Sequence, residues 1–206
     1  MTQQPRSARC WAFGALLASL AGCASDDALR SGLDDRGRTW TSLDATVTLA
    51  RAAPRFSNAA RDYLYVAPVE SNNGGARRHY LWVGLATTVD RAWPWAVPAD
   101  AVTLLLTLDG TPLTLPLVEW ETPDGAALYK TAAPVYRVRR ASVSLDVLER
   151  IAAATEIEAQ VVASDGSTAR YELWSGRWSD WSAFVAGVAG AAEPAEPAER
   201  QLGAAR

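Results

Sequence analysis

Turn residues placed beside runs of alternating apolar side chains constrain this chain more than any other feature of its sequence. Asp-Gly pairs occupy three such turns, at Asp109-Gly110, Asp124-Gly125 and Asp165-Gly166. The alternating runs next to them cover residues 102–108, 113–117, 127–131, 157–163 and 168–174. Because Asp-Gly accepts the positive φ angles of a tight hairpin turn, each flanked pair indicates two antiparallel strands. The sequence therefore predicts a domain made mostly of antiparallel sheet.

The earlier part of the chain has the same character. Extended, β-type runs cover residues 43–50, 62–69 and 79–88. An Asn- and Gly-rich loop over residues 71–75 joins the second run to the third, and it suits a backbone with positive φ angles. We expect these two runs to form a hairpin.

Two segments repeat their apolar residues with the period of a helix. Ser144 can cap a helix over residues 145–154. A second helix begins near Ser179, and its apolar stripe consists of Trp181, Phe184, Val185 and Val188. Each stripe needs an apolar surface to cover, so both helices should lie on a sheet. The predicted fold class is mainly β with a minor α+β character: an antiparallel β-sandwich or strongly curved sheet with two short covering helices.

The amino terminus has the pattern of an export signal. Arg6 and Arg9 precede an apolar stretch over residues 10–21, which is shorter than the about 20 residues that a membrane-spanning helix needs. The stretch ends in Leu20-Ala21-Gly22-Cys23, which resembles the lipobox of bacterial lipoproteins. This resemblance implies cleavage before Cys23, a diacylglyceryl group on its thiol and usually acylation of the new amino terminus. Two or more acyl chains hold a protein stably on a membrane.

The resemblance also bears on where the protein resides. In Gram-negative bacteria an aspartate directly after the lipidated cysteine often retains the lipoprotein in the inner membrane, and here that position is Ala24. We therefore expect a lipid-anchored envelope protein on the periplasmic face of the outer membrane.

These features divide the chain into four parts. They are the signal peptide (residues 1–22), the lipidated cysteine with a flexible tether (23–38), one β-rich domain (39–190) and a disordered Ala/Glu/Pro tail (191–206). The chain carries 23 acidic against 20 basic side chains, and processing removes two of the basic ones, so nucleic acid is not expected as a partner. Cys23 is the only cysteine after processing, which excludes a disulfide within the chain.

Residues able to perform catalysis are few. His79 is the only histidine, and no Gly-x-Ser-x-Gly sequence offers a nucleophile for it. Glu119 and Glu121 flank Trp120 and would share one face of a strand, where a carboxylate pair could act on a glycosidic bond. Two exposed glutamates opposite a buried tryptophan are the commoner arrangement. We therefore predict no enzymatic activity, no cofactor and no metal site, and we keep a cleft uniting His79 with the two glutamates as the alternative.

Tryptophan is unusually abundant. Alternation places Trp82 and Trp120 in the core, while Trp174, Trp178 and Trp181 should seal the second helix onto the sheet. Trp93-Pro94-Trp95 is different, because it lies in a proline-bounded connection over residues 90–100. Its two indoles could form a lid over one end of the domain or an exposed surface that stacks on a glycan or small molecule.

A basic strip completes the candidate binding residues. Arg137 and Arg139 alternate with apolar residues and should line one face of a strand, where they could meet anionic lipid head groups or an acidic partner. A solvated strand, or an edge strand protected by charge, would have the same pattern.

These observations favour a non-catalytic envelope lipoprotein, anchored to the membrane through Cys23, that binds or helps to assemble another envelope component, expected to be a protein. The alternative is a glycan or small-ligand binding module that uses Trp93 and Trp95.

Overall fold

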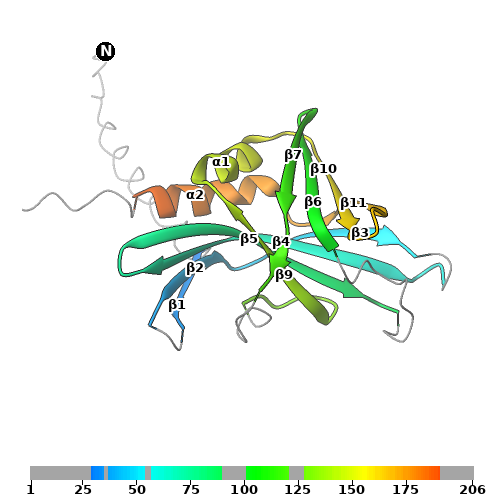
Figure 1. Cartoon of the computed structure of the whole chain (residues 1–206), viewed down its shortest axis with the longest axis horizontal. Helices are drawn as coiled ribbons and strands as arrows, with labels where there is room; N and C mark the ends of the chain where they lie inside the picture. The colour runs from blue at the N-terminus through cyan, green and yellow to red at the C-terminus, as the bar shows by residue number, and fades with distance from the viewer. Residues whose placement is uncertain (1–28, 35–36, 54–56, 90–100, 121–127, 191–206) are drawn as a thin grey trace, which may run out of the picture.

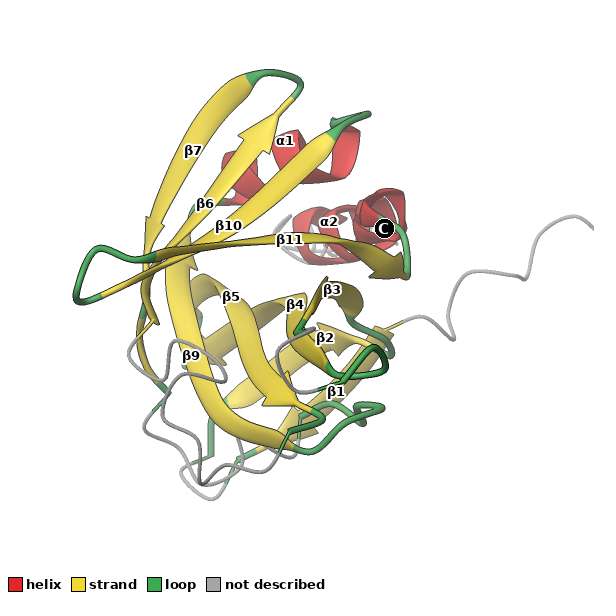
Figure 2. Cartoon of the chain, turned by 90° about the vertical axis from the view of Figure 1, so that its right-hand side faces the viewer, coloured by secondary structure: helices red, strands yellow, loops and turns green. Residues whose placement is uncertain are grey.

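The computed structural model describes residues 29–34, 37–53, 57–89, 101–120 and 128–190. In these residues the chain forms one antiparallel sheet and two α-helices, which confirms the predicted mainly-β class (Figures 1 and 2). The strands are β1 (Leu29–Leu33), β2 (Thr39–Leu43), β3 (Val47–Ala52), β4 (Arg61–Asn73), β5 (Ala76–Thr87), β6 (Ala101–Leu108), β7 (Thr111–Pro116), β8 (Val118–Glu119), β9 (Val135–Val143), β10 (Ile157–Ala163) and β11 (Thr168–Ser175).

The sheet curves until its two ends nearly meet. Its strands follow the order β7-β6-β10-β11-β3-β4-β5-β9-β8, and β2 pairs with β4 beside β3 and carries β1 at its outer edge. β7 pairs with β6 at one end of this order, and β8, which follows β7 after Leu117, pairs with β9 at the other end. One stretch of chain therefore links both ends, and the sheet resembles a barrel that is almost closed (Figure 2).

Local turn chemistry formed two of the three expected Asp-Gly hairpins, whereas residues 128–131, which were expected to form a strand after Asp124-Gly125, form no regular secondary structure. Asp109 and Gly110 have φ angles of 46° and 82°, as a tight turn between β6 and β7 requires. Gly166 turns the chain between β10 and β11 with a φ of 82°. The β4–β5 hairpin is confirmed, and its strands continue to Asn73 and Ala76, further into the expected loop than predicted. Asp124-Gly125 lies outside the described residues.

Both predicted helices are present. α1 (Leu145–Ala153) begins after Ser144, whose Oγ accepts a hydrogen bond of 3.3 Å from the backbone N–H of Val147. A short 3-10 helix, η3 (Trp178–Asp180), leads into α2 (Trp181–Gly190). The two helices pack together inside the curve of the sheet (Figure 2).

The sheet is buried on both faces around its centre. The face toward the helices forms what we term the inner core, which is mostly aliphatic and includes Leu64, Leu81, Leu104, Leu148, Trp181 and Phe184. The opposite face carries the outer layer, formed by Tyr65, Ala67, Val69, Trp82, Ala86, Leu128, Tyr129 and Ala133. Two layers on one sheet explain why β4 and β5 have long runs of consecutive buried residues.

Residues 128–133 hold the outer layer in place. Tyr129 Oη donates a hydrogen bond of 3.0 Å to the carbonyl of Pro68, and the backbone N–H of Ala133 donates one of 3.0 Å to Tyr65 Oη. Trp82 lies over Gly84, where an added Cβ would come within 2.5 Å of the indole. A segment without regular secondary structure therefore covers the sheet through specific polar contacts.

The structure corrects the expected tether boundary. Leu29–Leu33 forms β1 and pairs with β2, although this segment was expected to belong to a flexible tether that ends at residue 38. Contacts from other elements stabilise this strand: Gly32 sits beneath the indole of Trp40, and Leu29 packs closely on Gly187 of α2. Both contacts depend on glycines that leave room for a larger neighbour, and such pairs are not visible from the composition of residues 29–33.

Candidate functional site

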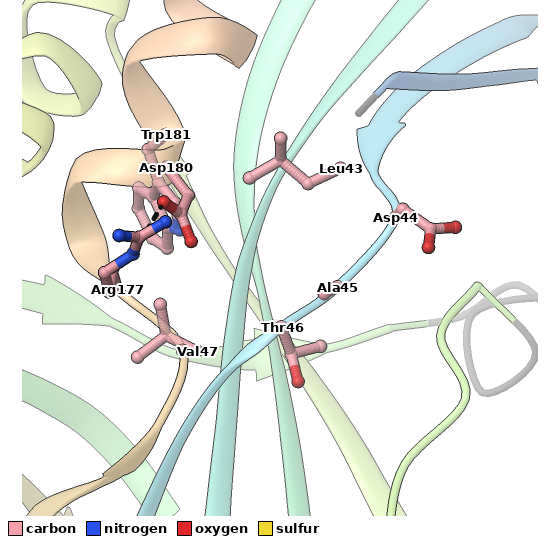
Figure 3. Close-up of a pocket in the computed structure, with 9 residues that line it drawn as sticks. Leu43, Asp44, Ala45, Thr46, Val47, Arg177, Asp180 and Trp181 are labelled. Carbon is pink, nitrogen blue, oxygen red and sulfur yellow. Dashed lines mark ion pairs between the residues drawn. The ribbon is translucent and has the colours of Figure 1, made fainter. Parts of the chain in front are cut away.

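A small pocket opens where the β2–β3 connection meets the start of η3 and α2. We call it the Trp181 pocket. Its volume is ≈ 180 Å³, and it is lined by Leu43, Asp44, Ala45, Thr46, Val47, Gly176, Arg177, Asp180 and Trp181 (Figure 3). The pocket thus joins two segments that are about 130 residues apart in the sequence.

Gly176 allows these two segments to approach each other. It has a φ of 85°, a conformation that favours glycine. A Cβ at this position would lie 3.0 Å from the carbonyl oxygen of Thr46 and 3.2 Å from Cα of Val47. Both the backbone angle and the close approach therefore require glycine here.

The chemistry of the pocket comes from one indole in an apolar lining. Trp181 is fully buried and packs edge-on against Trp178, with ring centroids 5.1 Å apart. Its Nε1 is buried and has no hydrogen-bond partner. Leaving such a donor unpaired costs about 1–3 kcal/mol.

Charged side chains form the rim of the Trp181 pocket. Arg177 Nε lies 3.2 Å from Asp180 Oδ1, an ion pair drawn in Figure 3, and Arg30 pairs with Asp44 on the other side. All four side chains are more than 40% exposed, so these pairs add little stability. They can exchange their partners for those of an incoming molecule.

A second, smaller pocket lies at the tip of the β4–β5 hairpin. This Arg78 pocket has a volume of ≈ 90 Å³ and is lined by Arg38, Ser71, Asn73, Ala76, Arg78 and Tyr80. Arg38 is held by Asp34, with Nε 2.7 Å from Oδ2. Arg78 is exposed and makes no ion pair with any described residue. The pocket therefore combines one fixed and one available guanidinium group.

The residues of the enzymatic alternative are not brought together. His79 Nε2 lies 3.2 Å from Glu70 Oε2, and Arg77 contacts both that carboxylate, at 3.6 Å, and the carbonyl of Val188, at 2.9 Å. Glu119 is exposed on β8, opposite Arg139 of β9. The register separates His79 from Glu119 by roughly 13 Å along the strands, four residues at about 3.3 Å each. Glu121 lies outside the described residues.

The predicted basic strip lies on the inner face of β9. Arg137 is paired opposite Leu85 and Arg139 opposite Val83, and both of these partners belong to the inner core. The two arginines are half-buried, and Arg139 Nε is buried without a hydrogen-bond partner. β9 pairs with β5 along most of its length and with β8 at Arg139 and Arg140, so an edge strand at this position is the wrong interpretation.

The burial of the tryptophans agrees only in part with the prediction. Trp82, Trp178 and Trp181 are buried as expected, and Trp120 is half-buried against the outer layer. Trp174 does not seal the helix: it is 59% exposed on the opposite face, next to Tyr63 and Arg61. Tyr171 faces the inner core, so alternation along β11 turns Trp174 to the opposite face of the sheet, where it is the extra residue of an irregularity in the pairing with β3. Trp93, Trp95 and Cys23 lie outside the described residues.

The residues that form the two pockets were not predicted from the sequence. Nothing in the sequence around Arg78 indicates a binding residue, and Trp181 was expected only to pack the helix onto the sheet. A signal existed for the Trp181 pocket: Gly176 interrupts the run of tryptophans and separates a strand from a helix, a position where the backbone turns. No comparable signal marks Arg78, because β2 brings Arg38 beside it only in the folded chain.

Comparisons of the chain with protein-family models, curated proteins and solved structures find no match. No helix within the described residues is long and apolar enough to cross a membrane. In the same part of the chain, no group of three or more His, Cys, Asp and Glu residues is placed to hold a metal ion.

Proposed function

We propose that this chain is a lipid-anchored, non-catalytic envelope lipoprotein that binds another envelope protein through the Trp181 pocket. The observation that carries the proposal is the small, mostly apolar Trp181 pocket with exposed charged side chains at its rim. A protein segment fits it, because an apolar side chain can enter the pocket while neighbouring polar groups meet the rim.

The size of the pocket favours such a segment over a metabolite. Sites for small molecules usually measure about 300–1,000 Å³, whereas this pocket measures ≈ 180 Å³. One anchoring side chain in a small pocket, with a polar rim around it, is typical of the centre of a protein interface. Arg177, Asp180 and Asp44 would form that rim.

The position of the pocket suits an anchored protein. Leu29, the first described residue, is paired opposite Leu43, which lines the pocket. Cys23 precedes Leu29 by six residues, and a chain of that length spans at most about 20 Å. Lipid on Cys23 would therefore hold the pocket, and any partner in it, close to the membrane.

The arrangement of titratable groups supports a binding role. His79 is engaged by Glu70 on the inner face, and Glu119 stands apart on β8. A general acid and base must both reach one substrate. In the described part of the chain, these candidates do not.

The anchor is tested by metabolic labelling. We expect the chain produced in a Gram-negative host to incorporate labelled palmitate and to fractionate with membranes, and the Cys23→Ser variant to do neither. An unlabelled wild-type chain would contradict the anchor, whatever the pocket binds.

The pocket is tested by photocrosslinking in intact cells from a reactive amino acid at position 46. Ala45 lines the pocket and is exposed, so Ala45→Phe should block it without disturbing the core. We expect one defined protein adduct, reduced about tenfold by Ala45→Phe, which corresponds to about 1.4 kcal/mol. Ala52→Phe, an equally exposed alanine at the end of β3, is the matched control. Adducts that Ala45→Phe leaves unchanged would exclude the pocket as the binding site.

A further inference from the structure

We infer that the Arg78 pocket binds the phosphate of an anionic phospholipid, and that this contact orients the domain on the membrane that holds its anchor. The inference rests on the proposed lipid anchor and adds a second membrane contact, at a site separate from the Trp181 pocket.

The pocket has the charge and the polar groups that a phosphate requires. Arg78 offers its guanidinium without competition from a described carboxylate, and Ser71 and Asn73 add uncharged polar groups. Arginine suits phosphate because its planar donors can bind two oxygens at once. The small volume of ≈ 90 Å³ fits a single compact anion better than a larger ligand.

The walls of the pocket are fixed before a ligand arrives. Asp34 holds Arg38 twice, through Nε at 2.7 Å and through the backbone N–H at 2.8 Å. The ring of Tyr80 contacts two side chains: the guanidinium of Arg140 lies 5.0 Å from its centroid, and the Trp120 ring packs against it in a T-shaped arrangement with centroids 6.0 Å apart. Groups already held in position lose little entropy when a ligand binds.

The location of the pocket points to a lipid as the source of the phosphate. The β1–β2 and β4–β5 hairpins lie side by side through the pairing of Thr39 with Asn72; in Figure 1 both lie on the left side of the molecule, where the β4–β5 tip points to the left and the β1–β2 tip points downward. Leu33, at the end of β1, is 69% exposed at this tip. An exposed apolar side chain next to a basic pocket is suited to the boundary between head groups and acyl chains.

The anchor can reach the same membrane surface. β1 measures about 13 Å from Leu29 to Leu33, at about 3.3 Å per residue. The six residues from Cys23 to Leu29 span up to about 20 Å. Lipid on Cys23 can therefore enter a bilayer that also touches the hairpin tips.

The experiment uses the processed chain, residues 23–206, with Cys23→Ser so that no acyl chain contributes. Its binding is measured to vesicles of phosphatidylcholine alone and of phosphatidylcholine with phosphatidylglycerol. We expect binding only when phosphatidylglycerol is present. Arg78→Gln should weaken it about fivefold, the effect of one basic residue near an anionic surface. Arg170→Gln, an exposed arginine on β11, removes the same charge elsewhere and should change it little.

Each other outcome overturns the inference. Equal loss from both substitutions would mean that only net charge matters, and equal binding to both vesicles would mean that the phosphatidylglycerol phosphate is not recognised. If inorganic phosphate stabilises the chain against unfolding but the chain does not bind vesicles, the pocket is a site for a free anion and not for a lipid. Because the assay contains neither acyl anchor nor partner protein, its failure leaves the labelling and crosslinking results of the proposed function standing.

Discussion

The two buried layers of the sheet are built by different means. The inner core gathers mostly aliphatic side chains from strands and helices, and the ion pairs of Glu70 with His79 and Arg77 lie on the same face. The outer layer gathers aromatic side chains beneath residues 128–133, and two hydrogen bonds hold it: the Tyr129 hydroxyl donates one, and the Tyr65 hydroxyl accepts the other. The two faces of one sheet are therefore stabilised differently: one mainly by the packing of apolar side chains, and the other by hydrogen bonds to an irregular segment that covers it.

The largest expected effect tests whether the outer layer is a true core. Trp82 and Leu81 are neighbours on β5 that point to opposite layers, and both are fully buried. We expect Trp82→Ala to lower the free energy of unfolding by about 4 kcal/mol and Leu81→Ala by about 3 kcal/mol, from lost burial and the cavities left behind. Urea unfolding of the two variants measures this. A cost below about 1 kcal/mol for Trp82→Ala would show that the outer layer is only a covered surface.

A smaller effect separates the two layers by their tyrosines. Tyr129 Oη donates to the Pro68 carbonyl in the outer layer, whereas the buried Tyr171 hydroxyl of the inner core has no hydrogen-bond partner. We expect Tyr129→Phe to cost about 1–2 kcal/mol because a buried carbonyl loses its donor. Tyr171→Phe should be neutral or stabilising, because it removes an unpaired hydroxyl. Equal costs in urea unfolding would mean that the hydrogen bond does not distinguish the layers.

The smallest expected effect, counted per tyrosine and per pH unit, is a loss of stability in alkali. Burial is the main cause that raises the pKa of Tyr65, Tyr129 and Tyr171 above the ordinary value of 10.0. Because the pKa of each tyrosine is raised in the folded state, its contribution to the stability of the fold is complete below about pH 10. This stability is lost as the pH rises toward the folded-state pKa values. Each tyrosine should then cost up to about 1.4 kcal/mol per pH unit. Unfolding measured between pH 9 and 11 should be less steeply pH-dependent for Tyr129→Phe, and an unchanged slope would contradict this assignment.

Local sequence signals predicted most strands and both helices of this fold. Features that depend on contacts between distant segments were not predicted. Asp109-Gly110 acts through its own backbone angles, and Ser144 acts through a side-chain hydrogen bond to a residue three positions later, so the sequence was sufficient to place the turn and the helix. Trp174 was placed wrongly, because alternation along β11 turns it to the face opposite Tyr171 and away from the helices. Neither pocket could be predicted, since Trp181 meets Thr46, and Arg38 meets Arg78, only after distant strands have paired.

The pairing of β3 with β11 has a consequence for folding while the chain is being synthesised. β3 ends at Ala52 and its partner β11 begins at Thr168, so the two must close a loop of more than a hundred residues. A chain that is synthesised from its amino terminus can form the local β4–β5 hairpin early, but β3 keeps an open edge until β11 has been made. During that interval the unpaired edge is a site for wrong pairing with other chains. The last strand of the sheet is therefore the one that ends the period of aggregation risk.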